Sequence, residues 1–260
     1  MTQTIQILLP EWQSFLALIV RVGGLLAALP ILSGHAVPTK VKVLLVLALS
    51  AVLAPVVRLP AVPFDPVALA AGLAGELAIG LTIGLAVRLF FGALELAGDV
   101  VGMQMGFGVV QLLDPATSHH MPVIGRFFTL LALLVFLSLN AHVLVVSTIV
   151  ASYDAIPAFG MLLPMGWGEE IVYLSREMFV IGLKLATPVL VTVLVTNVLL
   201  AILGRAVAQI NVFVLSFPIT IAGGLVMLAL AMPFVVGLLG GEIERLELEI
   251  ERLVRAMGHG

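Results

Sequence analysis

The chain has 260 residues, of which 62% are hydrophobic and only 10% are charged. Soluble domains have roughly 45–50% apolar and about 25% charged residues, so this composition excludes an ordinary soluble globule. The net charge of -3, without a basic block, argues against a nucleic-acid partner, and the lack of cysteine excludes disulfides and thiolate sites. We therefore expect a protein whose surroundings are lipid or other apolar protein.

Long apolar stretches separated by proline and glycine run through the sequence. Most are close to the length of about 20 residues that crosses the hydrocarbon core of a bilayer as a helix. No sustained alternation of apolar and polar residues predicts strands. We expect an all-α, multi-helix integral-membrane-type fold in residues 1–240, followed by an amphipathic tail in 241–260. Its six long apolar helices are expected at Trp12–Leu32, Val41–Val57, Val67–Phe91, Phe127–Val150, Met178–Leu203 and Val212–Leu239.

Charged residues lie well inside these apolar stretches at Arg21, Glu76, Arg88 and Lys184. Each would cost at least about 2.5–3.5 kcal/mol at a lipid-facing position in mid-membrane. We expect them to face protein or water within an assembly. For Arg88 and Lys184 an alternative is that they lie near helix ends and extend their charged groups to the membrane surface.

Two carboxylates follow Arg88 on the same predicted helix face, Glu95 and Asp99. Their separations from Arg88, about 10 and 16 Å along the helix, are too long for direct pairing, so partners must come from elsewhere. Structural pairing within an assembly is one reading of this face. A proton or cation path is the other, because intramembrane carboxylates often mark such paths.

Small residues recur at four-residue spacing in Gly98-xxx-Gly102-xxx-Gly106. This spacing places glycines on one helix face, where two backbones can approach closely. The segment 102–108 then alternates glycine with large flexible side chains. Glycine tolerates unusual backbone angles and methionine adapts its shape, so this segment is expected to deform and still seal. Its members are Gly102, Met103, Met105, Gly106, Phe107 and Gly108.

No catalytic or cofactor-binding motif is found. The five histidines lack metal-ligand spacing, and the sequence contains no nucleophile elbow, phosphate-binding loop or dinucleotide fingerprint. We expect a protein that is not an enzyme and that holds no metal or cofactor.

The composition changes abruptly after Gly241 to a run rich in glutamate and arginine. Ile243, Leu246, Ile250 and Leu253 follow the three-four spacing of a coiled-coil seam. Docking of this seam on a partner helix is the preferred interpretation. Two alternatives remain: the tail folds back onto its own protein, or it frays.

Several elements in fixed order resemble the FliR family of flagellar type III export-gate subunits, whose counterpart in virulence secretion is SctT. The resemblance covers nearly the whole chain, with small departures at Ala141, Ala208 and Ser216. The matching elements are Arg21 with Pro30 and Pro38, Gly102 to Phe107 with Asp114-Pro115, Pro122 to Phe127, Asn140-Ala141-His142, Gln209 to Phe213 and Phe217-Pro218.

The resemblance implies a subunit of the flagellar basal body in the bacterial inner membrane. It would assemble with FliP-like and FliQ-like subunits, near FlhB-like and FlhA-like proteins, into a gate that passes unfolded flagellar proteins. In that family the loop after the glycine-rich stretch plugs the pore. The matching segment here is Met103–Pro122, which includes Asp114 and Pro115, and its expected sealing side chains are Met105 and Phe107.

Other functions remain open at this point. A virulence export-gate subunit would carry the same pattern. A small-solute or ion transporter would share the composition and the intramembrane charges, and should be active alone in liposomes. An intramembrane enzyme would require a catalytic pair that the sequence does not contain.

Overall fold

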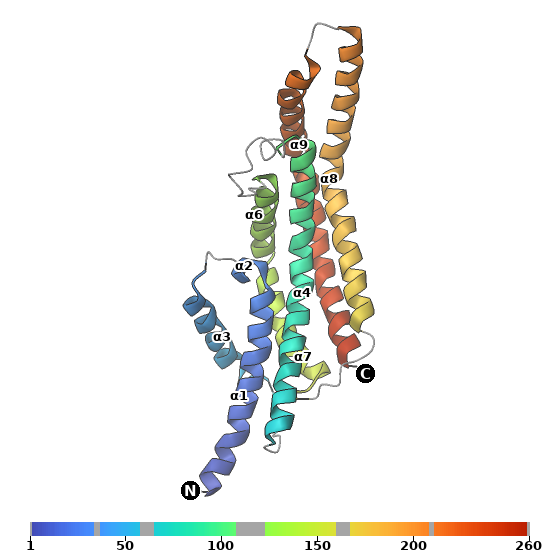
Figure 1. The fold of residues 1–260 in the computed structure, drawn as a ribbon. Helices are drawn as coiled ribbons and strands as arrows, with labels where there is room; N and C mark the ends of the chain where they lie inside the picture. The colour runs from blue at the N-terminus through green and yellow to red at the C-terminus, as the bar shows by residue number, and fades with distance from the viewer. Residues whose placement is uncertain are drawn as a thin grey trace. The chain divides into compact units, whose positions relative to one another are not determined.

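A computed structural model describes residues 2–33, 37–57, 65–107, 123–159, 167–207 and 211–258. Every regular element in these ranges is an α-helix, which confirms the predicted all-α class (Figure 1). The helices are α1 (Thr2–Ala28), α2 (Pro30–Ser33), α3 (Thr39–Leu53), α4 (Pro66–Gln104), α6 (Val123–Ser138), α7 (Ala141–Ala155), α8 (Trp167–Ala206) and α9 (Val212–Gly258).

Three helices in the described ranges are long and apolar enough to cross a membrane: α4, α8 and α9. A fourth span results if α6 and α7, which are bent at Leu139–Asn140, count as one. The expected six spans are therefore not confirmed. The apolar part of α1, Phe15–Ala28, and the 15 residues of α3 are shorter than the roughly 20 residues that a spanning helix needs.

The described chain forms two compact units. The first contains Met1–Phe90, Asn140–Ser175 and Glu244–Gly260, and the second contains Phe91–Leu139 and Arg176–Ile243. Helices α4, α8 and α9 each contribute residues to both units.

In the first unit, α1 packs against α3 and against the beginning of α4. Glycines permit the closest approach: a methyl group placed on Gly24 would lie 2.9 Å from the Leu77 carbonyl oxygen, and one on Gly84 would lie 2.7 Å from that of Leu25. Gly80 lies directly against the backbone of Arg21. The two helix backbones therefore touch, as expected where small residues line a crossing.

In the second unit, the end of α4 contacts three other helices. Gly98 lies against the backbone of Gly125 at the beginning of α6, and the ring centroids of Phe91 and Phe136 are 5.5 Å apart. A side chain on Gly182 of α8 would meet the Ala93 carbonyl oxygen at 2.9 Å. The contact with α9 forms part of the candidate site.

Candidate functional site

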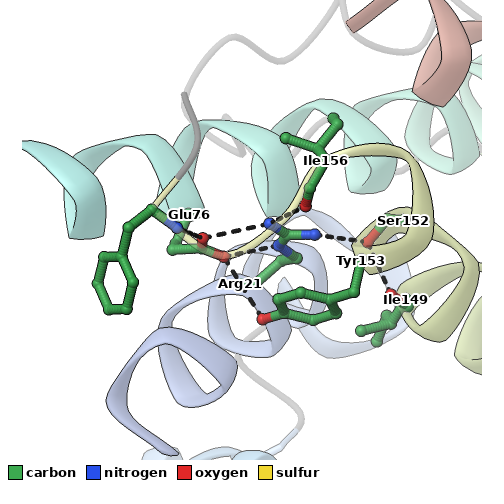
Figure 2. Close-up of polar contacts among 7 residues, drawn as sticks. Arg21, Glu76, Ile149, Ser152, Tyr153 and Ile156 are labelled. Atoms are coloured by element: carbon green, nitrogen blue, oxygen red, sulfur yellow. Dashed lines mark hydrogen bonds and ion pairs between the residues drawn. The ribbon is translucent and has the colours of Figure 1, made fainter. Parts of the chain in front are cut away.

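A buried ion pair joins α1 to α4 in the first unit. Arg21 Nε donates to Glu76 Oε2 at 2.6 Å, and an Nη of the same guanidinium donates to Oε1 at 3.2 Å (Figure 2). The Arg21 side chain is fully buried and that of Glu76 is 1% exposed. A two-point contact between arginine and a carboxylate fixes orientation as well as distance.

The rest of the Arg21 guanidinium contacts α7 and the residue after it. Its other Nη donates to Ser152 Oγ at 2.9 Å, and the Nη shared with Glu76 also donates to the Ile156 carbonyl at 3.1 Å. Ser152 in turn donates to the Ile149 carbonyl at 2.7 Å, and the Tyr153 ring lies 3.6 Å below the guanidinium carbon. Figure 2 shows these groups gathered around Arg21.

Glu76 has two further donors. The Tyr153 hydroxyl lies 3.4 Å from Oε2, and the Phe159 backbone N–H donates to Oε1 at 3.0 Å. Phe159 has a φ of 60°, a left-handed conformation that is unfavourable for a bulky residue. Its ring occupies the space left by the missing side chain of Gly72 on α4.

These contacts connect α1, α4 and α7 and stabilise their packing, so the cluster has a structural role. The two charges neutralise each other, and hydrogen bonds occupy their remaining polar atoms, which is the condition under which a buried pair is tolerated. Arg21 and Glu76 thus face protein, and in this structure that protein is the chain itself. Among the described residues, no group of three or more histidines and carboxylates is placed to hold a metal ion.

The two other cations of the apolar stretches, Arg88 and Lys184, have different surroundings. Arg88 and Lys184 are exposed on the chain, and each lies well inside its helix rather than at an end. Neither has an ion-pair partner in the part of the chain that the structure describes. Glu95 is exposed too, while Asp99 has one buried oxygen without a hydrogen-bond partner. The structure therefore does not pair this face of α4 within the described chain.

The glycine-methionine segment ends α4. The Phe107 N–H donates to the Gly102 carbonyl at 3.0 Å, and the Gly106 N–H donates to that of Met103 at 3.1 Å. Gly106 has a φ of 93°. These features together form a Schellman cap, in which a glycine beyond the last helical turn adopts left-handed angles. A helix stop is thus one reason for glycine at this position.

The large side chains of this segment point to different surroundings. Met103 is 66% exposed, Phe107 is half-buried, and Met105 is completely buried. Of the two side chains expected to seal the pore, Phe107 is thus partly exposed, whereas Met105 packs inside its own chain. Gly108, Asp114 and Pro115 lie outside the described residues.

The tail is the continuous end of α9, which passes through Gly240 and Gly241 without a break. Its four seam residues are buried within this chain, which agrees with the alternative that the tail folds onto its own protein. The end of the tail also contacts its own chain: the carbonyl of Ala155, at the end of α7, lies 2.6 Å from where a side chain on Gly258 would begin. The four buried seam residues are Ile243, Leu246, Ile250 and Leu253.

This packing gives a prediction for the tail. Replacing Leu246 and Ile250 together with aspartate is expected to destabilise the first unit by several kcal/mol, because buried unpaired carboxylates are strongly unfavourable. Thermal unfolding of the purified chain measures the effect. Leu248→Asp is the matched control, since Leu248 is 58% exposed. Equal stability of the double variant and this control would contradict the assignment.

The sequence did not identify several residues of the charge cluster around Arg21 and of the contact around Met105. Ser152 and Tyr153 complete the charge cluster, and their signal was a run of polar residues at the end of an otherwise apolar helix. Gly224 and Thr220 of α9 contact Met105. The adjacent glycines 223 and 224 within an apolar stretch were a signal for close packing there.

Comparison with known proteins gives matches over most of the chain. The family model described as "Bacterial export proteins, family 1" matches residues 12–246. The flagellar biosynthetic protein FliR of Escherichia coli K12 is 32% identical over 236 residues, which are 89% of this chain and 90% of that protein. FliR of Pectobacterium carotovorum is 31% identical over 83% of both chains, and FliR of Bacillus subtilis is 34% identical over 60% of this chain and 62% of its own.

Proposed function

The chain belongs to family 1 of the bacterial export proteins, which includes the flagellar biosynthetic protein FliR, and we propose on this premise that it is a subunit of the flagellar type III export gate. The observation that carries the proposal is the match to FliR over about nine-tenths of both chains. The all-helical fold with long apolar helices agrees with this role.

We propose that the gate forms with FliP-like and FliQ-like subunits in the inner membrane of the basal body, near FlhB-like and FlhA-like proteins. Its cargo would be unfolded flagellar proteins. Large apolar side chains such as Leu194 of α8 and Leu230 of α9 are exposed on the single chain, and their surfaces suit lipid or helices of other subunits. The exposed charges of Arg88 and Lys184 favour protein or water over lipid at those two positions.

Copurification tests this assembly. Co-expressed with its FliP-like and FliQ-like subunits, the chain should be recovered from detergent in one complex with both. A small-solute transporter would instead be active alone, so the purified single chain should give no ion or solute flux in liposomes. Recovery of the chain without either subunit, together with flux from the chain alone, would favour the transporter.

The exposed end of α4 is our proposed seal of the idle channel. A pore for an unfolded chain must exclude ions at rest, and an apolar constriction does this by dewetting, without charge. Met103 and Phe107 provide the apolar bulk that is not committed to the interior of the chain. Gly102 and Gly106 set the helix end that carries them.

Removing these two side chains should open the seal. Met103→Ala combined with Phe107→Ala is expected to raise the resting ion conductance of cells with the complete gate by roughly tenfold or more, because a constriction without bulky apolar groups stays hydrated. Recovery of the complex should not change. Gln104→Ala is the control, since Gln104 is an exposed polar neighbour. Wild-type conductance in the double variant would contradict the seal.

A further inference from the structure

The last turn of α4 is held on α9 by a contact of unusual closeness. The Met105 side chain lies where a side chain on Gly224 would begin: Cγ, Cε and Sδ are 2.7, 2.8 and 2.9 Å from that position. The Met105 side chain has no solvent exposure. Any residue larger than glycine at position 224 would therefore displace it.

Two neighbours on α9 complete the contact. The Thr220 hydroxyl donates within its own helix to the Ser216 carbonyl at 2.8 Å and lies 3.4 Å from the Met105 carbonyl oxygen. The Phe217 ring lies 3.0 Å from where a side chain on Gly106 would begin. The Met105 side chain, the Met105 carbonyl and the Gly106 cap thus all contact one face of α9. Positions 217, 220 and 224 lie on this face because they are separated by three and four residues.

We infer that Gly224 is a positioning residue for the seal: it forms the notch on α9 that holds Met105 and thereby fixes where Met103 and Phe107 lie. This inference rests on the proposed function and adds a part to it. Met105 is flanked on both sides by the two proposed sealing residues, separated from each by two positions. Met105 directly follows Gln104, the last residue of α4, and Gly106 forms the helix cap. Loss of the notch would therefore shift both sealing side chains.

A substitution at the notch tests the inference. Gly224→Ala should raise the resting ion conductance of cells carrying the complete gate by roughly tenfold, since the added methyl group overlaps three atoms of the Met105 side chain, which must then move out of its present position. Gly223→Ala is the matched control on the preceding residue, because a methyl group there would lie 3.9 Å from Thr196 Oγ1, an ordinary contact. The chain has no cysteine, so Met103→Cys can serve as a specific probe. Its thiol-labelling rate should change with Gly224→Ala and stay the same with Gly223→Ala.

Exchanging the side-chain sizes at positions 105 and 224 distinguishes a loss of positioning of the seal from a general destabilisation of the gate. Met105→Ala empties the notch without any clash and should also raise conductance. Gly224→Ala combined with Met105→Ala refills part of the space, and conductance should return toward the wild-type value. If Gly224→Ala prevents assembly, Met105→Ala alone decides. Wild-type conductance and labelling in Met105→Ala, or in an assembled Gly224→Ala gate, would overturn the inference.

These outcomes are distinct from failure of the seal itself. If Met103→Ala with Phe107→Ala leaks while the notch variants stay ion-tight, the seal stands and Gly224 has no positioning role. If that double variant is ion-tight, the seal assignment fails whatever Gly224 does.

Discussion

Glu76→Leu is expected to lower the free energy of unfolding of the chain by about 3–5 kcal/mol, because it leaves the Arg21 guanidinium buried without its counter-ion. The variant also removes the acceptor for the Phe159 N–H and the Tyr153 hydroxyl. A domain with a total stability of about 5–15 kcal/mol would lose a large part of it. Denaturation of the purified chain in detergent measures the loss, and recovery of the gate complex should fall in parallel.

A pair of further variants makes this test specific. Arg21→Leu combined with Glu76→Leu should be more stable than either single variant, since two apolar side chains often replace a buried ion pair at little cost. Glu95→Leu is the control, because Glu95 is an exposed carboxylate on the same helix. If Glu76→Leu is as stable as Glu95→Leu, the Arg21–Glu76 ion pair does not stabilise the packing of these helices.

Gly80→Ala is expected to produce the second large effect, through the backbone rather than through charge. A methyl group at this position would overlap the Arg21 carbonyl, so α1 and α4 must separate. Such overpacking costs about 1–3 kcal/mol and here would also lengthen the Arg21–Glu76 contact. Thermal unfolding and complex recovery are the measurements.

A glycine of the same helix pair provides the control. A methyl group on Gly23 of α1 would lie 3.8 Å from the nearest side chain, that of Val46, which is an ordinary contact. Gly23→Ala should therefore raise stability by roughly 0.5–1 kcal/mol, since alanine favours helix over glycine. Equal effects of both substitutions would show that α1 and α4 do not need to touch at Gly80.

The sequence predicts the all-helical class and the burial of Arg21 and Glu76 because both follow from composition and from the cost of charge in an apolar segment. It does not predict which groups meet that charge. Ser152 is 131 residues from Arg21 along the chain, and no local pattern reports such a separation. The sequence also does not predict the number of spanning helices, because an apolar stretch such as α3 matches a membrane-spanning helix in composition but not in length.

Local patterns indicate spacing better than role. Gly98 and Gly106 belong to one four-residue series, yet Gly98 allows close approach of α6 and Gly106 forms a helix cap. The tail gives a second example. The spacing of its apolar residues predicts a buried seam, but a sequence does not show whether such a seam packs on its own chain or on another. In both cases tertiary contacts decide the role.

Secretion in the native bacterium tests the central claim, that the chain is a subunit of the flagellar export gate. After deletion of its gene, flagellar filament protein should disappear from the culture medium and accumulate inside the cells. The wild-type chain should restore secretion, whereas Glu76→Leu should restore little and Glu95→Leu should restore it fully. Undiminished secretion of filament protein in the deletion strain would contradict the account.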